Sequence, residues 1–135
     1  MEWNYANKNH STIINEKNGV VYLTFPKLAA AGVRHGFSTR MGGVSKGYLG
    51  TMNLSFTRGD REENVRENFR RIADAIGFRE EQLVFSAQVH ETKIRKVTAA
   101  NRGEGITKET APGIDGLATD EADVPLYTSY ADCVP

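Results

Sequence analysis

Residues 60–77, which read DREENVRENFRRIADAIG, decide the fold because they form the one long helical pattern of this 135-residue chain. Asp60 is expected to cap a helix over residues 62–76, and Gly77 is expected to end it. Apolar side chains recur at helical spacing and predict one stripe that packs on a core. They are Val65, Phe69, Ile72 and Ile76. The charged residues beside the stripe predict either a solvated helix face or an arginine that faces substrate. They are Arg66, Glu67, Arg70 and Arg71.

Strand-like segments lie on both sides of this helix. Before it, residues 12–14 and 20–25 flank Asn18-Gly19, a dipeptide typical of tight hairpin turns. Residues 26–32 then predict a short helix with Pro26 in its first turn, and residues 33–39 predict a strand. After the long helix, β-branched and aromatic content predicts further strands. They cover residues 83–90, 94–97, 113–119 and 124–130.

This order of elements favours an α+β fold, a mixed β-sheet sandwich with flanking helices. The patterns leave open whether neighbouring strands run parallel or antiparallel. We expect a single domain over residues 1–135, in which residues 1–11 are a loosely held lead-in.

The charge balance and the single cysteine limit the class of protein. Seventeen Lys and Arg residues balance seventeen Asp and Glu residues, so no overall field would recruit nucleic acid or an anionic membrane. No apolar run approaches the roughly 18 residues of a membrane span, and residues 1–5 lack the pattern of a signal peptide. Cys133 cannot form an internal disulfide, which fits a reducing compartment. We therefore expect a cytoplasmic protein with neither nucleic acid nor membrane as partner.

Residues 40–55, RMGGVSKGYLGTMNLS, are rich in glycine and are expected to form an ordered loop. Glycines let backbone N–H groups turn toward an anion, and Arg40 is a fork-shaped donor beside Gly42 and Gly43. The alternative is that the Gly-Gly pair serves only the turn itself. The segment matches neither a P-loop nor a dinucleotide fingerprint.

Two predicted strands lead to potential ligands. Residues 83–90 end on His90, and residues 124–130 lead to Asp132 and Cys133. A cysteine and a histidine at similar strand ends predict either a shared site or two structural residues. The sequence alone leaves both alternatives open.

The order of short motifs resembles that of the YfiH family, also labelled the laccase-domain or multicopper polyphenol oxidoreductase family. The motifs are HGFSTR at 35–40, GGVS at 42–45, NL at 53–54, GD at 59–60, Val65 with Asn68 in the helix, QVH at 88–90 and ADCVP at 131–135. The resemblance covers about residues 33–135. It implies a YfiH-like fold that is incomplete here, with this chain as its N-terminal part.

The chain departs from the family pattern in two places. Phe69 follows Asn68 where the family has Arg, so either Arg70 or Arg71 substitutes or that contact is absent. The family also continues to a His-Ala-Gly-Trp-Arg-Gly segment with a third metal-binding His, and this sequence has no such segment. His10 and His35 stand in other motif contexts. The departure predicts little or no turnover by the 135-residue chain alone.

The resemblance implies an enzyme that acts on purine nucleosides and phosphate, as a purine nucleoside phosphorylase or adenosine deaminase. Its implied substrates are adenosine, inosine, guanosine and methylthioadenosine. Implied zinc ligands are His90 and Cys133, and zinc lowers the pKa of a bound water. The neighbouring Asp132 would then shuttle protons or only orient the site.

Phosphorolysis would need an anion pocket, which the resemblance and the residue types assign to Arg40, Gly42 and Gly43. Two amide side chains, of Asn53 and Gln88, would hydrogen-bond ribose or base, or would instead pin loops.

Three alternatives remain beside this reading. Cys133 and His90 would form a thiolate–imidazole pair in a zinc-free hydrolase of the deamidase type. A copper-dependent polyphenol oxidase, as the family label suggests, would need more histidines than the three present. The third alternative is a folded binding module without catalysis. The oligomeric state is left open.

Overall fold

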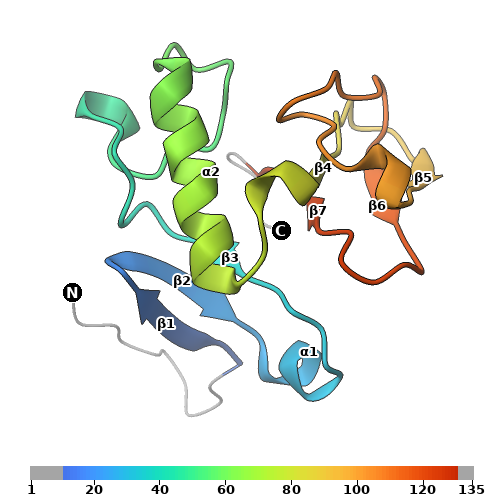
Figure 1. The fold of residues 1–135 in the computed structure, drawn as a ribbon, viewed down its shortest axis with the longest axis horizontal. Helices are drawn as coiled ribbons and strands as arrows, with labels where there is room; N and C mark the ends of the chain where they lie inside the picture. Colours follow the sequence, from blue (N-terminus) through green and yellow to red (C-terminus); the bar gives the residue numbers. More distant parts are fainter. Residues whose placement is uncertain (1–10, 131–135) are drawn as a thin grey trace. The chain divides into compact units, whose positions relative to one another are not determined.

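The computed structural model describes residues 11–130 and divides the chain into two compact units, residues 1–77 and 78–135 (Figure 1). Asp132 and Cys133 lie outside the described residues. The single domain over residues 1–135 stays a prediction.

The first unit begins with the predicted hairpin. Strands β1 (Ile13–Lys17) and β2 (Val20–Thr24) pair antiparallel. Asn18 and Gly19 both have positive φ, 53° and 79°, which is the backbone that a two-residue hairpin turn requires. The short helix α1 (Pro26–Ala30) follows with its proline in the first turn, as expected.

The strand predicted over residues 33–39 is much shorter in the structure. Only β3 (Phe37–Ser38) pairs with β2, antiparallel. Before β3, the side chain of His35 binds the residue that follows the hairpin: its Nε2 accepts from the N–H of Phe25 at 2.7 Å. Nδ1 of the same ring lies 2.8 Å from the Val33 carbonyl oxygen. Because this side chain engages the start of α1, the backbone leaves the ladder until Phe37.

The long helix α2 (Glu62–Ile76) has the predicted bounds and ends at Gly77, whose φ of 101° is left-handed. Its buried residues are Val65, Asn68, Phe69, Ile72, Ala73 and Ala75. The prediction that Asp60 is the N-cap is wrong, because the structure places Arg61 at that position without a side-chain cap. Asp60 still supports the first turn, since its Oδ1 accepts from the N–H of Arg61 and from Nδ2 of Asn64.

The core of the first unit joins α2 to the hairpin and to the loop before the helix. Its buried members are Val20, Met52, Ile72 and Ala75. Tyr22, Leu54 and Ile76 pack against them and are partly buried. The helix therefore fixes both the hairpin and the glycine-rich segment, which also contains the short 3-10 helix η1 (Gly47–Leu49).

The second unit contains two short parallel strand pairs. Strand β4 (Val84–Phe85) pairs with β7 (Leu126–Tyr127), and β5 (Ile94–Lys96) pairs with β6 (Gly116–Ala118). Two 3-10 turns, η2 (Glu80–Gln82) and η3 (Ala99–Asn101), precede β4 and follow β5. The core consists of Val84, Val97 and Val124, with Leu117 packed against it.

The strands predicted over residues 83–90 and 124–130 shrink to β4 and β7. After β4 the chain makes only a single antiparallel bridge, between Ala87 and Ile114, and His90 adopts a left-handed conformation with φ of 63°. A residue in that conformation cannot continue a strand. Antiparallel pairs in the first unit and parallel pairs in the second give the mixed α/β content that was expected, whereas the sandwich stays a prediction.

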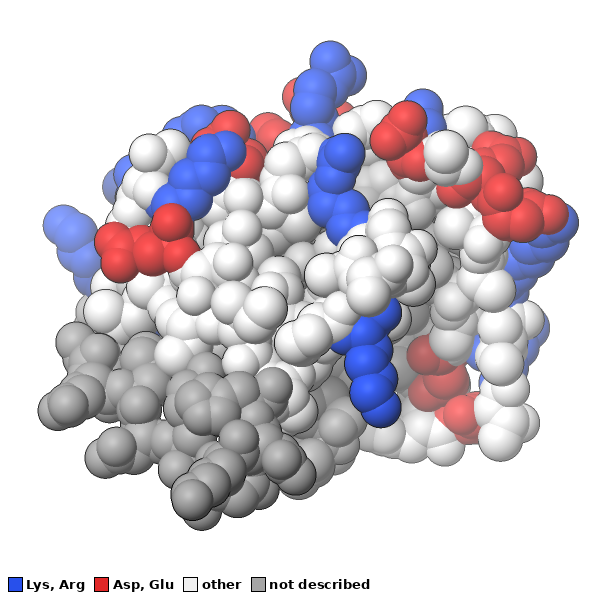
Figure 2. All heavy atoms as spheres, turned by 90° about the horizontal axis from the view of Figure 1, so that it is seen from below, with Lys and Arg blue, Asp and Glu red and all other residues white. Residues whose placement is uncertain are grey.

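The described helices and the face drawn in Figure 2 bear on membrane and charge interactions. Within residues 11–130 no helix is long and apolar enough to cross a membrane. On the face shown in Figure 2, acidic and basic side chains are interspersed.

Candidate functional site

The glycine-rich loop of the first unit is closed by the guanidinium of Arg40. Its Nε donates to the carbonyl oxygen of Gly50 at 3.0 Å, and Nη2 donates to the same oxygen. The carbonyl of Arg40 in turn accepts from the N–H groups of Thr51 and Met52, at 3.1 and 3.2 Å. Arg40 therefore joins the two ends of the loop.

The amides of the loop are directed at the protein itself. The N–H of Gly43 donates to Oγ1 of Thr51 at 3.1 Å, and the N–H of Ser45 donates to the Thr51 carbonyl at 2.9 Å. A Cβ on Gly43 would lie 2.1 Å from that carbonyl, and one on Gly42 would lie 2.4 Å from the carbonyl of Gly19. These contacts support the alternative in which the glycines serve the turn, and their phosphate role stays a prediction.

A buried polar network lies under the loop and includes Asn53. Nδ2 of Asn68 donates to Oγ of Ser45 and to the carbonyl of Asn53, both at 2.8 Å. Nδ2 of Asn53 and Oγ of Ser45 both donate to Oδ2 of Asp60. The Ser45 hydroxyl, followed by the Asn64 amide, lowers the pKa of Asp60 to about 2. The side chain of Asn53 thus pins the loop, and its role toward ribose or base stays a prediction.

The helix arginines separate into two groups. Arg66 pairs with Glu62 at 2.8 Å and is exposed, which fits a solvated helix face. Arg70 and Arg71 both bind Glu67, and their hydrogen bonds, Arg70 first, lower the pKa of that carboxyl to about 2.

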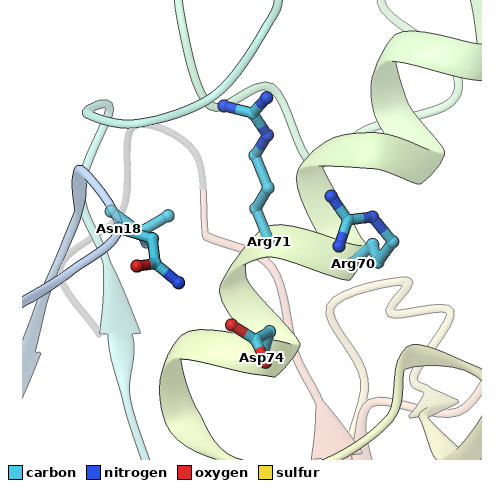
Figure 3. Close-up of a pocket in the computed structure, with 5 residues that line it drawn as sticks. Asn18, Arg70, Arg71 and Asp74 are labelled. Atoms are coloured by element: carbon cyan, nitrogen blue, oxygen red, sulfur yellow. The ribbon is translucent and has the colours of Figure 1, made fainter.

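Arg70 and Arg71 also line an open pocket of about 230 Å³, with Asn18, Val20 and Asp74 as its other residues (Figure 3). Nη1 of Arg71 reaches the carbonyl of Gly42 at 3.1 Å. The pocket therefore adjoins the glycine loop, although it holds acidic as well as basic groups.

In the second unit, Gln88 and His90 follow β4 on an irregular segment. Nε2 of Gln88 donates to the carbonyl of Ser129 at 2.9 Å. The N–H groups of Val89 and His90 both donate to Oδ1 of Asp115, at 3.0 and 2.7 Å. The His90 side chain is exposed. The structure thus holds the backbone of His90 firmly and leaves its imidazole facing solvent.

The described residues contain no complete set of zinc ligands. Within residues 11–130 no group of three or more His, Cys, Asp or Glu residues could hold a metal ion. His90 offers one imidazole, a donor that suits zinc. His35 uses both ring nitrogens in hydrogen bonds within its unit. The donor set is therefore incomplete in the described residues, and a zinc site of His90 with Cys133 stays a prediction.

Two residues with clear structural consequences were not assigned a role from the sequence. Asn68 fits a family motif, but only the structure shows it fully buried and bonded to three partners in the loop. Asp115 acts on backbone 25 and 26 residues away, a separation at which no sequence pattern signals contact.

Residues 34–135 match the model of a family described as multi-copper polyphenol oxidoreductase laccase. A purine nucleoside phosphorylase, YlmD, from Geobacillus stearothermophilus is 43% identical over 107 residues, which are 78% of this chain and 39% of that protein. The purine nucleoside phosphorylase SACOL1200 of Staphylococcus aureus is 32% identical over 123 residues, 90% of this chain and 47% of its own length.

Solved structures agree with these sequence matches. The crystal structure of YlmD from Geobacillus stearothermophilus superposes with a TM-score of 0.73 at 37% identity, covering 85% of this chain and 43% of that one. The Bacillus licheniformis hypothetical protein YfiH gives a TM-score of 0.72 at 27% identity, covering 84% and 42%. The chain spans less than half the length of these relatives.

Proposed function

The chain belongs to the family described as multi-copper polyphenol oxidoreductase laccase, and from this premise we propose that it forms part of a purine nucleoside phosphorylase. The observation that carries the proposal is the similarity to relatives with that name, which extends over most of this chain. Nucleosides and phosphate are the substrates that the name implies. Adenosine, inosine, guanosine and methylthioadenosine are the proposed nucleosides.

Zinc is the proposed cofactor, and His90 and Cys133 are the residues of this chain that would hold it. When bound, zinc would supply Lewis acidity at the site. Asp132 would hold or transfer a proton beside Cys133. The exposed imidazole of His90, on a backbone fixed by two hydrogen bonds, supports its assignment as a ligand.

Phosphate binding is assigned to Arg40 with Gly42 and Gly43. A guanidinium carries five N–H groups, and Arg40 directs its Nε–H and one Nη2–H at Gly50. The remaining N–H groups are the ones proposed to meet a phosphate oxygen. Asn53 and Gln88 are the proposed contacts to ribose or base, although each donates to a neighbouring loop in the structure.

The test is to incubate adenosine with a protein that contains this chain and extends to the length of the relatives, with and without phosphate. Chromatography separates the products, and release of adenine that depends on phosphate is expected. Inosine would instead indicate deamination. Unchanged adenosine from folded, zinc-loaded protein would contradict the proposal and would favour the Cys133 hydrolase.

Variants locate the activity in this chain. His90→Ala is expected to lower turnover strongly, to a residual rate that can still be measured, whereas Glu91→Gln, an exposed neighbour, should retain it. For phosphate, Arg40→Met should raise the KM for phosphate more than the KM for adenosine. The unextended 135-residue chain is expected to give little or no product.

A further inference from the structure

A side chain distant in sequence holds the backbone of His90 in an uncommon conformation. His90 has a φ of 63°, in the left-handed region that favours glycine. Its N–H and that of Val89 both donate to Oδ1 of Asp115, at 2.7 and 3.0 Å. Residues other than glycine remain in this region only where surrounding contacts over-determine the backbone. The carboxylate of Asp115 is the contact that does so here.

Asp115 is itself fixed on both sides. Its N–H and the N–H of Gly116 both donate to the carbonyl of Lys93, at 3.0 and 3.1 Å, and Gly116 begins strand β6. On the other side, the N–H of Ile114 donates to the carbonyl of Ala87 at 3.2 Å. Ile114 is only 4% exposed. The carboxylate is therefore presented from paired, buried backbone.

The two ends of this arrangement differ in how open they are. Oδ2 of Asp115 is shielded from solvent and has no hydrogen-bond partner, a costly state for a carboxylate oxygen. By contrast, the His90 side chain is exposed, and among residues 11–130 no hydrogen bond to its ring is observed. The contacts thus order the backbone that carries the imidazole and leave the ring open to a ligand.

We propose that Asp115 is the positioning residue of the candidate site: it locks the left-handed turn at His90 and thereby sets the direction of the His90 imidazole. Asp115 acts through this turn and touches no substrate. The inference rests on the proposed function in one respect, namely that His90 is the residue used there.

The turn is tested first, in the 135-residue chain itself, by hydrogen exchange of the Val89 and His90 amides and by the ring signal of His90 in NMR. Asp115→Ala should speed exchange of both amides by about 10-fold or more and broaden or shift the ring signal. Asp115→Asn keeps an acceptor oxygen and should restore most of the protection. Glu91→Gln removes an exposed neighbouring charge, keeps the Asp115 carboxylate and is the control. Unchanged exchange in Asp115→Ala would overturn the proposal whatever the protein's activity.

The link to the site is tested in the protein of the relatives' length with adenosine. Asp115→Ala should lower kcat by about 10–100-fold with a smaller change in KM, as when the support of a ligand is lost. Asp115→Asn should recover most of the loss. Adding Asp115→Ala to His90→Ala should cause no further loss, because both act through the same imidazole. Additive losses would show that Asp115 acts elsewhere and would refute the proposal.

The two hypotheses fail in different ways. If the wild-type protein turned over no nucleoside, the proposed function would be wrong. The amide exchange and the ring signal of His90 would still show whether Asp115 sets the direction of the His90 imidazole.

Discussion

Asn68 on α2 makes three hydrogen bonds to the glycine-rich loop. It is fully buried, its Oδ1 accepts from the N–H of Val44 at 2.8 Å, and its Nδ2 serves Ser45 and Asn53. Buried polar groups are tolerated when every donor and acceptor is satisfied, and they are costly when one partner is removed. Asn68 therefore ties the glycine-rich loop to α2.

Replacing Asn68 with Ala should destabilise the protein by about 2–3 kcal/mol, because the N–H of Val44 and the hydroxyl of Ser45 lose a buried partner. Urea denaturation measures the change. Asn64→Ala on the same helix removes one partly buried hydrogen bond to Asp60 and should cost about 1 kcal/mol or less. Equal losses in the two variants would contradict the importance given to the buried network.

Asp60 gives the acid stability of the protein a specific pH range. Hydrogen bonds led by that of the Ser45 hydroxyl lower its pKa from the ordinary 3.8 to about 2. Asp60 therefore takes up its proton at a lower pH in the folded protein than in the unfolded protein. The resulting stabilisation of the folded state is present above pH 3.8 and is lost as the pH falls toward 2.

The pH profile of the thermal midpoint should show this loss, and Asp60→Asn should flatten it in the same range. Glu67, whose pKa is also lowered to about 2 by Arg70 and then Arg71, is the comparison. Glu67→Gln should flatten the profile from pH 4.5 down to about 2, a range that includes that of Asp60. A profile that neither variant changes would mean that the two carboxyls are not the source of the acid sensitivity.

At the scale of elements, helical signals were more informative than strand signals. The stripe from Val65 to Ile76 and the stop at Gly77 gave the bounds of α2 correctly, because a 3.6-residue period and a left-handed glycine are local properties. The predicted strands were too long, since side chains in contact across the fold interrupt them. His35 does so before β3 and Asp115 after β4.

The glycine-rich loop is expected to reject side chains at specific positions. In Gly43→Ala the new methyl would lie 2.1 Å from the carbonyl oxygen of Thr51, so the bond from Ser45 to that carbonyl would have to break. The free energy of unfolding is expected to fall by about 3 kcal/mol or more, because of overpacking and a lost hydrogen bond.

Gly47→Ala is the control within the same loop. A Cβ there meets nothing within 4 Å, although φ is +62°, so only backbone strain of about 1–2 kcal/mol is expected. Urea denaturation compares the two variants. A milder effect at Gly43 than at Gly47 would disagree with the close packing of the loop.

At the scale of the whole molecule, the ordered motifs identified the family, which the matched residues 34–135 confirm. The sense of strand pairing was not predictable, because β4 and β7 are separated by 40 residues of chain and local composition carries no information about the pairing direction. The predicted ligands are divided in the same way: Gln88 and His90 lie in the second unit, and Arg40 and Asn53 lie in the first. No pattern in the sequence indicates that these residues belong to two separate units.

The charge balance leads to a prediction about partners. With seventeen basic and seventeen acidic residues, and both signs interspersed on the face shown in Figure 2, we expect no salt-dependent binding to double-stranded DNA. Fluorescence anisotropy of a labelled duplex at low and physiological salt measures this. A basic DNA-binding domain run in parallel is the positive control, and tight binding at low salt would refute the prediction.

The aromatic pair Phe85 and Tyr127, whose rings are tilted by 39° with centroids 4.4 Å apart, joins β4 to β7 and also gives the second unit an optical reporter. Burial raises the pKa of Tyr127 from 10.0 to about 12. Folded protein therefore keeps this phenol protonated where unfolded protein ionises it, and the linked stability is present below pH 10 and lost as the pH rises toward 12. In an alkaline titration, the tyrosinate absorbance that Tyr127→Phe removes should consequently appear together with the loss of the second unit's structure, without any added dye.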